Sequence, residues 1–143
     1  MLAKALTWQA PFPVIFSAGP NAALLTLPDV TLFIADTDYE LLRAEEVHEV
    51  LGTDGSAVTL DIKKCTTTQA AASGTTMLSS TFNLKATVQT TQTKTRASGL
   101  TTTLANRRVA SGNRIALDFG GTMTAVAGVC VVLWLRRLRK PTY

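Results

Sequence analysis

The sequence has few of the residues that most often carry out chemistry. Its 143 residues include one histidine, His48, and two cysteines, Cys65 and Cys130. His48 lies among carboxylates in EEVHEV, which we interpret as a solvated face. The cysteines are far apart and lack metal-ligand spacing, so we expect two buried free thiols in a protein made in a reducing cytoplasm.

Sequence motifs of catalysis are missing as well. The chain contains no glycine-rich phosphate loop, no GxSxG and no HExxH. His48 could act with a neighbouring carboxylate, but no nucleophile or ligand set converges on it. Asp36 and Asp38 could hold a cation, although a polar turn is the commoner use of such spacing. We therefore predict a protein that is not an enzyme and has no cofactor and no metal site.

Charged side chains make up only 17% of the residues, and threonine, serine, asparagine and glutamine largely replace them. Threonine is β-branched and fits a pleated, half-exposed surface, so this composition favours β-structure. The net charge of +4 comes from Arg136, Arg137, Arg139 and Lys140, because the other ten of the fourteen basic residues balance the ten acidic ones. A nucleic-acid binder has a basic face with reading elements, so we expect no nucleic-acid partner.

No apolar run is long enough for a membrane helix. The best candidate, Met123–Leu135, extends back only to Gly120 before it meets Asp118, whereas a spanning helix needs about 20 apolar residues. Its valines and Gly128 favour a central strand that buries both faces between two packed layers. The basic residues that follow resemble a stop-transfer signal. A tail-anchored protein is therefore the least favoured alternative, and we expect no membrane partner.

Short alternating runs separated by turn signals occupy residues 28–136. Val30–Asp36 is a compact β-run, and Ser111–Asn113 and Gly120–Gly121 are predicted turns. Two further runs alternate, and each is expected to turn one face inward: Val58, Leu60 and Ile62, and Ile115, Leu117 and Phe119. About seven or eight short strands predict an all-β fold, a single antiparallel β-sandwich of the jelly-roll type.

Residues 39–51 give conflicting signals. Residues 37–40 fit a helical capping box, and apolar residues recur at helical spacing: Leu41, Ala44, Val47 and Leu51. Asp54-Gly55, however, is a strong hairpin turn, and clean alternation follows it. The local signals alone slightly favour a helix.

The threonine-rich stretch beyond Cys65 begins with a predicted loop. Residues 80–98 and 99–111 have few charges and few large apolar residues. We expect them to form strands that tolerate solvent or a polar subunit interface. A low-complexity linker is the competing interpretation, and Phe82, Leu84 and Val88 argue against it.

Residues 1–27 form an apolar N-terminal arm. Trp8, Gln9, Pro11 and Pro13 interrupt a signal-peptide helix, so we expect no secretion signal. The prolines at positions 11, 13 and 20 prevent ladder hydrogen bonding, so we expect an extended, irregular middle. The arm either wraps its own domain or docks on a neighbouring subunit. We predict docking, with Trp8, Phe12, Ile15 and Phe16 as the partner-binding residues. Deleting residues 1–20 should then leave the fold nearly intact and abolish attachment. Residues 137–143 form a basic C-terminal tag.

Residues 39–135 resemble small structural proteins encoded among the head genes of tailed bacteriophages. The resemblance rests on YELLRAEEVHEVLGTDGSAVTLDIKK, on TFNLKATVQTTQTKTRA with ANRRVASGNRIALDFGGT, and on the valine-rich Ala125–Leu135. It implies a β-sandwich or jelly-roll decoration (cement) protein, often a trimer, on the outside of a capsid. It also favours a strand over residues 39–51. Thirteen residues are long for a strand, so we expect a bulge or bend there.

The resemblance and the residues together predict a virion subunit that stabilises a phage head without catalysis. Its expected partners are the major capsid protein and further copies of itself, as a trimer. Its expected location is the outer surface of the capsid, after assembly in the host cytoplasm. The alternative is a virion fibre, spike or carbohydrate-binding module with the same fold. That alternative needs exposed aromatic residues or a cation site on the loops, in which the sequence is poor.

Overall fold

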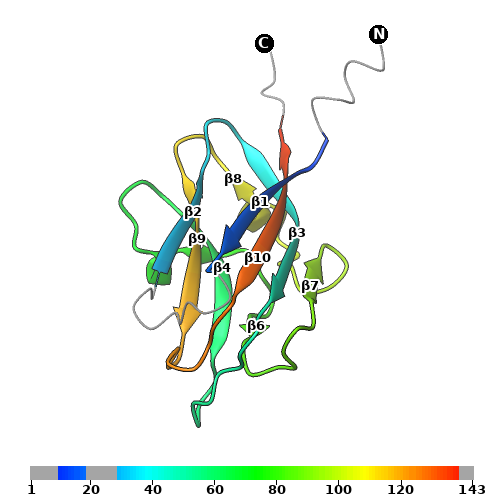
Figure 1. The fold of residues 1–143 in the computed structure, drawn as a ribbon. Helices are drawn as coiled ribbons and strands as arrows, with labels where there is room; N and C mark the ends of the chain where they lie inside the picture. The colour runs from blue at the N-terminus through cyan, green and yellow to red at the C-terminus, as the bar shows by residue number, and fades with distance from the viewer. Residues whose placement is uncertain (1–9, 19–28, 139–143) are drawn as a thin grey trace, which may run out of the picture.

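The protein folds into two β-sheets that pack face to face (Figure 1). This computed structural model describes residues 10–18 and 29–138, and we name each sheet after a central strand. The β10 sheet contains, in spatial order, β1 (Phe12–Ser17), β10 (Cys130–Arg137), β3 (Tyr39–Val47) and β7 (Gln92–Thr95), and β8 (Arg108–Val109) also pairs with β3. The β9 sheet contains β2 (Asp29–Ile34), β9 (Arg114–Gly120), β4 (Thr59–Cys65) and β5 (Thr75–Thr76), and β6 (Phe82–Asn83) also pairs with β4.

All pairings between these strands are antiparallel. Consecutive strands belong to different sheets after β1, β2, β3, β6, β8 and β9. The predicted fold class, a single antiparallel β-sandwich, is therefore confirmed.

The core lies between the sheets and is built from alternate residues of the strands. The two predicted alternating runs, Val58 to Ile62 and Ile115 to Phe119, turn their apolar side chains inward as expected. Each such side chain contributes about 1.5–3 kcal/mol when fully buried. β10 alternates between buried and half-buried residues, so the prediction that this strand buries both faces is wrong. Only one of its faces meets the core, because nothing in the described residues is layered on the other.

Residues 39–47 form a strand, β3, and the helical interpretation of the local signals is wrong. The register of β3 against β10 shifts where Trp134 lies opposite Arg43 and Leu135 lies opposite Leu41. Leu42 is therefore the extra residue of a bulge, which confirms the predicted irregularity. The bulge also explains the misleading period, because it places Leu41 and Ala44 on the same buried face although they are three residues apart.

Asp54-Gly55 does not close a hairpin. The strands on either side of it, β3 and β4, belong to different sheets, so the turn lies in a crossover. Asp54 organises this loop by accepting hydrogen bonds from the backbone N–H groups of Ser56 and Thr122 at 3.2 and 3.1 Å. These hydrogen bonds hold the pKa of Asp54 well below its usual range. A turn signal defines a change of direction, but it does not say which sheet the next strand joins.

The threonine-rich stretch contains less strand than we predicted. Only the two-residue β6 and the four-residue β7 form between residues 81 and 98. A short helix, α2 (Leu104–Arg107), stands where a strand was expected. A further helical turn, η1 (Ala71–Ser73), covers Cys65 and Ala116 on the outer side of the β9 sheet.

The middle of the predicted arm is a strand of the domain itself. β1 pairs with β10 from Phe12 opposite Leu135 to Ser17 opposite Cys130, so the expectation of an irregular segment is wrong for these residues. Pro13 is tolerated because β1 is an edge strand, where a missing N–H need not interrupt a ladder. Deleting residues 1–20 would remove this strand, so the expected survival of the fold no longer follows. Trp8 lies outside the described residues.

The C-terminal basic residues divide between the sheet and the undescribed end. Arg136 and Arg137 are the last residues of β10, so the sheet extends into the predicted tag, whereas residues 139–143 lie outside the described ranges. In residues 10–18 and 29–138, no helix has the length and apolar character needed to cross a membrane.

Candidate functional site

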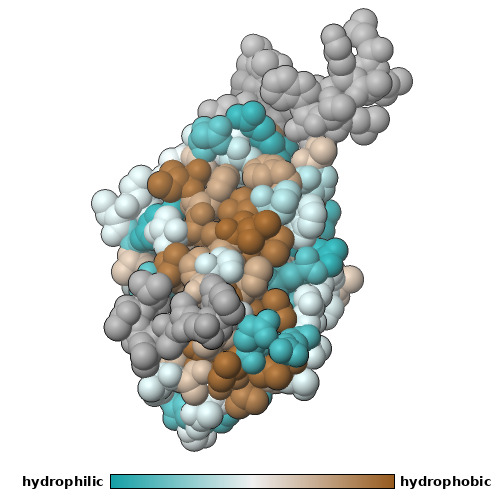
Figure 2. Space-filling model, viewed as in Figure 1, coloured by the Kyte–Doolittle hydropathy of each residue, from teal (hydrophilic) through white to brown (hydrophobic). Residues whose placement is uncertain are grey.

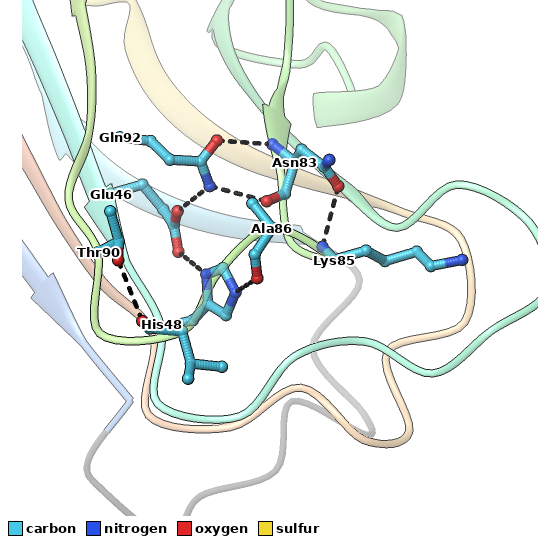
Figure 3. A network of polar contacts seen from close by, with 8 residues as sticks. Glu46, His48, Asn83, Lys85, Ala86, Thr90 and Gln92 are labelled. Atoms are coloured by element: carbon cyan, nitrogen blue, oxygen red, sulfur yellow. Dashed lines mark hydrogen bonds and ion pairs between the residues drawn. The ribbon is translucent and has the colours of Figure 1, made fainter.

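His48 is completely buried, and the prediction of a solvated face is wrong. It lies just beyond β3 and forms a closed network with the loop that joins β6 to β7 (Figure 3). Its Nδ1 lies 2.9 Å from Oε1 of Glu46, and its Nε2 lies 3.2 Å from the carbonyl oxygen of Ala86. Gln92 donates to the other carboxylate oxygen of Glu46 at 2.8 Å and to the carbonyl of Asn83 at 2.7 Å.

These partners define where the protons lie. Nε2 of His48 faces a carbonyl oxygen, so it carries a proton. Nδ1 faces Glu46, so a second proton lies between the ring and the carboxylate. Burial raises the pKa of Glu46, while hydrogen bonds from His48 and Gln92 oppose the shift. Every polar side-chain atom of Glu46, His48 and Gln92 is used in holding the loop against β3. The arrangement therefore fits a structural clamp better than an acid–base centre.

The Asp36–Asp38 segment is a polar turn. Asp36 accepts a hydrogen bond from the Tyr39 hydroxyl and a second from Arg137 at 3.2 Å, and Asp38 accepts one from the backbone N–H of Ser111 at 2.9 Å. The hydrogen bond from Tyr39 lowers the pKa of Asp36. Burial, with the hydrogen bond to Asp36, raises the pKa of Tyr39. Within the described part of the chain, no cluster of three or more His, Cys, Asp or Glu side chains could hold a metal.

Both cysteines are free thiols, as expected. Cys65 is buried under η1, and burial raises the pKa of its thiol. Cys130 is only half-buried, because it starts β10 on the side away from the core. The prediction of two buried thiols therefore holds for Cys65 alone.

The outward side of β1, β10 and β3 is the best candidate for a functional surface, and we call it the β10 face. Antiparallel register aligns its side chains in rows across the three strands. Ile15, Val132 and Glu45 form one row, and Pro13, Trp134 and Arg43 form the next. Ile15 is 61% exposed. The centre of the β10 face is therefore apolar, and charged residues border it along β3.

Two hollows lie on the β10 face. One, of about 260 Å³, is lined by Pro11, Leu42, Arg43 and Trp134. The other, of about 180 Å³, is lined by Glu45, Glu46, Val47, Thr91, Cys130 and Val132. Trp134 donates its indole N–H to Glu45 at 3.0 Å, which fixes the ring against the sheet. The bulge forms the wall of the larger hollow, because it is the extra residue Leu42 that lies beside Trp134.

β1 carries apolar side chains on both of its faces. Phe12 and Phe16 are half-buried against the core, and the Phe12 ring meets Tyr39 and Phe33 at centroid distances of 5.6 and 6.3 Å. Ile15 points the other way. Figure 2 shows apolar surface gathered over β1 and the strands beside it. The partner-binding role predicted for Trp8, Phe12, Ile15 and Phe16 stays a prediction. Of the three that are described, Ile15 is the exposed one and so is best placed to contact a partner.

Sequence reasoning missed the outward position of Val132 and Trp134. We expected Trp134 inside a strand buried on both faces, but it is half-buried on the β10 face. The sequence did contain a signal of this outward position: Arg136, two residues after Trp134. In a strand, Val132, Trp134 and Arg136 share one face, and a charged residue on a face argues against its complete burial.

Comparison with known proteins gives a structural match alone. No protein-family model and no curated protein sequence matches the chain. A chain in the solved structure titled "Capsid of Ralstonia phage GP4" aligns with a TM-score of 0.64 at 10% identity, over 91% of this chain and 86% of that chain. At this identity the match shows a shared fold. A chain from the infectious bursal disease virus Gx strain aligns at a TM-score of 0.24, 13% identity, over 93% of this chain and 35% of that one, and supports no conclusion.

Proposed function

We propose that the protein is a structural, non-enzymatic virion subunit: a decoration (cement) protein that binds the outer surface of a phage capsid through its β10 face. The observation that carries the proposal is the apolar centre of this face, with Ile15 61% exposed. The shared fold with a chain of a phage capsid structure supports it, because the alignment covers most of both chains. The partners would be the major capsid protein and further copies of this chain, as a trimer.

The mechanism is burial of a preformed surface. Ile15, Val132 and Trp134 are held in rows by strand pairing, so docking orders few additional side chains and loses little conformational entropy. Each large apolar side chain contributes about 1.5–3 kcal/mol on full burial. Many copies, each with a modest affinity, would stiffen a shell without any chemical step.

The test compares two isoleucines on opposite sheets. Ile15 lies on β1 at the β10 face, and Ile34, at the end of β2, is 69% exposed. We expect Ile15→Asp to weaken binding to particles that lack the protein by about tenfold or more, which corresponds to about 1.4 kcal/mol. Ile34→Asp should leave binding unchanged. Retention after sedimentation of the particles, with urea unfolding of both variants as a control, gives the answer. Equal retention of the two variants would contradict the proposal that the protein binds the capsid through its β10 face.

One observation favours the alternative of a carbohydrate-binding module. The larger hollow combines an aromatic side chain, Trp134, with the charged Arg43, and aromatic faces with polar neighbours suit sugar rings. Glycan-array binding that is lost in Trp134→Ala and kept in Ile34→Asp would place this reading above the capsid proposal. Absence of glycan binding, with particle retention sensitive to Ile15→Asp, would reject it.

A further inference from the structure

Three arginines converge on one buried glutamate at the end of the β10 face. Glu40 is 1% exposed, and its Oε2 accepts a hydrogen bond from Nη2 of Arg136 at 2.7 Å. Its other oxygen, Oε1, lies 3.6 Å from Nη2 of Arg96 and 3.9 Å from Nη1 of Arg107. Only the first of these contacts is a close ion pair, so the remaining two guanidinium groups are held loosely.

The sheet brings these residues together from distant parts of the chain. Glu40 on β3 lies opposite Arg136 on β10 and opposite Arg108 on β8. Partners in antiparallel register point to the same side of a sheet. The side chains of Glu40, Arg136 and Arg108 therefore all lie on the outward side of the β10 sheet. Arg96 follows the end of β7, and Arg107 ends α2.

The cluster has more positive charge and more hydrogen-bond donors than the protein itself satisfies. The charges of Arg96, Arg107 and Arg136 exceed that of Glu40 by two. Four buried atoms of the cluster make no hydrogen bond within the described residues: Oε1 of Glu40, Nε and Nη1 of Arg107, and Nε of Arg136. The Arg107 side chain is only 8% exposed, and unpaired buried charge is costly. Arg96, at 52%, and Arg136, at 31%, open the cluster to the outside.

We propose that this arginine cluster binds a carboxylate group, an aspartate or glutamate side chain on the protein surface against which the β10 face docks. The inference rests on the proposed function. A planar carboxylate matches the paired N–H groups of a guanidinium. It enters beside Arg96 and Arg136 and takes up the surplus donors.

The neighbouring surface favours a protein partner over a nucleic acid. The apolar hollow with Trp134 and Arg43 lies one row along the same face from Arg136 and Glu40. A protein interface has an apolar centre and a polar rim, whereas a nucleic-acid site would extend the basic surface. The carboxylate would fix the orientation of docking and speed association at low salt.

The test uses the full chain and a glutamate hexapeptide as the probe. Arginine Nε–Hε signals in nitrogen-15 NMR report the binding directly. We expect saturable shifts of the Arg107 and Arg136 signals. Arg96→Gln should weaken binding about fivefold or more, and it should fold normally because Arg96 is half exposed. The matched control is Lys85→Gln, an exposed charge in the loop between β6 and β7, which should change binding less than about twofold.

Glu40→Gln separates a binding site from a structural ion cluster. Glutamine keeps an acceptor for Arg136 and removes the negative charge that competes with the peptide. The hexapeptide should therefore bind about fivefold more tightly. Equal weakening by Arg96→Gln and Lys85→Gln, or absent shifts, would overturn the proposal. So would tighter binding of a thymidine oligonucleotide of equal charge. Because no particle is involved, failure here with particle retention still sensitive to Ile15→Asp would leave the proposed function standing.

Discussion

Strand β3 carries two buried glutamates whose surroundings differ. Glu46 faces the core side and has both oxygens hydrogen-bonded, to His48 at 2.9 Å and to Gln92 at 2.8 Å. Glu40 faces the outer side, and one of its oxygens has no hydrogen-bond partner in the described residues. The first glutamate holds one proton with one imidazole in a closed set. The second faces an excess of arginines at the border of an exposed face.

A buried charge whose polar atoms are all hydrogen-bonded stabilises the fold, whereas one with unsatisfied partners near the surface is available to an interface. A polar network that is fully satisfied fixes one conformation. A network with surplus donors close to the surface leaves free energy to be gained from a partner. Burial alone does not distinguish the two glutamates, because each is 1% exposed. The count of satisfied atoms does.

The largest expected effect is on stability when each glutamate is removed. Glu46→Ala leaves Nδ1 of the buried His48 and the amide of Gln92 without their shared partner. We therefore expect a loss of about 3–5 kcal/mol in the free energy of unfolding. Glu40→Ala should cost less, about 1–3 kcal/mol, because Arg96 and Arg136 can turn toward solvent and the buried Arg107 meets Glu40 only at 3.9 Å. Urea unfolding of both variants measures the difference.

Glu49→Ala is the control for this pair. Glu49 is exposed and accepts a hydrogen bond from Gln89 at 3.0 Å, so its removal should change stability by about 0.5 kcal/mol or less. Should Glu40→Ala prove as damaging as Glu46→Ala, the outer cluster would be a structural element like the inner one, and the contrast would disappear.

The next effect concerns pH. Burial raises the pKa of Glu46 in the folded state, so its contribution to stability is complete at pH values below the unfolded pKa and is lost as pH rises through the folded pKa. Above neutral pH the unfolded chain holds an ionised carboxylate, whereas the folded network needs the shared proton. The free energy of unfolding should therefore fall with rising pH, by up to about 1.4 kcal/mol per pH unit.

Glu46→Gln sharpens this prediction because the amide imitates the protonated acid. Its NH₂ group can donate to Nδ1 of His48 while its oxygen accepts from Gln92, and no proton then titrates. We expect a flat stability between about pH 7.5 and 9, above the titrations of the carboxylates and of a histidine in the unfolded chain. Asp36 and Asp54 have lowered pKa values and lose stability only in acid, so they do not interfere. A pH slope identical in wild type and variant would reject the proton assignment.

The smallest expected effect is on the outer cluster. Arg96→Gln should change the free energy of unfolding by no more than about 0.5 kcal/mol, because this half-exposed guanidinium meets Oε1 of Glu40 only at 3.6 Å. Added salt should stabilise the wild type slightly more than the variant, since salt screens repulsion among the arginines. Unfolding in low and high salt measures both. A loss above about 1 kcal/mol would show that Arg96 is a required partner of Glu40.

Patterns within a strand were predictable, and contacts between distant strands were not. Alternation identified the inward faces around β4 and β9 because a strand that meets a core on one side must repeat every two residues. The same logic failed at β3, where the bulge at Leu42 gave a helix-like spacing to a strand. It also failed at Trp134, where the period alone does not say whether a second layer covers the outer face.

The arginine cluster had no sequence signal at all. Glu40, Arg96, Arg107 and Arg136 come from four different places in the chain, and only the pairing of β3 with its neighbours assembles them. Arg137 was interpreted as part of a tag, although it is the last residue of β10, because charge counting along a sequence ignores the sheet. The apolar character of β1 could be seen in the sequence, but Pro13 within it and Pro11 before it argued against the edge strand that forms there.

The pairing of β1 with β10 also limits when this protein can fold. Phe12 lies opposite Leu135, so the first described strand finds its neighbour only after nearly the whole described chain has left the ribosome. Contacts that close such long loops are slow to form, and all-β domains of this kind fold in roughly milliseconds to seconds. During synthesis, the apolar side chains of β1 therefore stay exposed until β10, their partner strand, has been made. The prolines at positions 11 and 13 would make that waiting segment a poor template for aggregation.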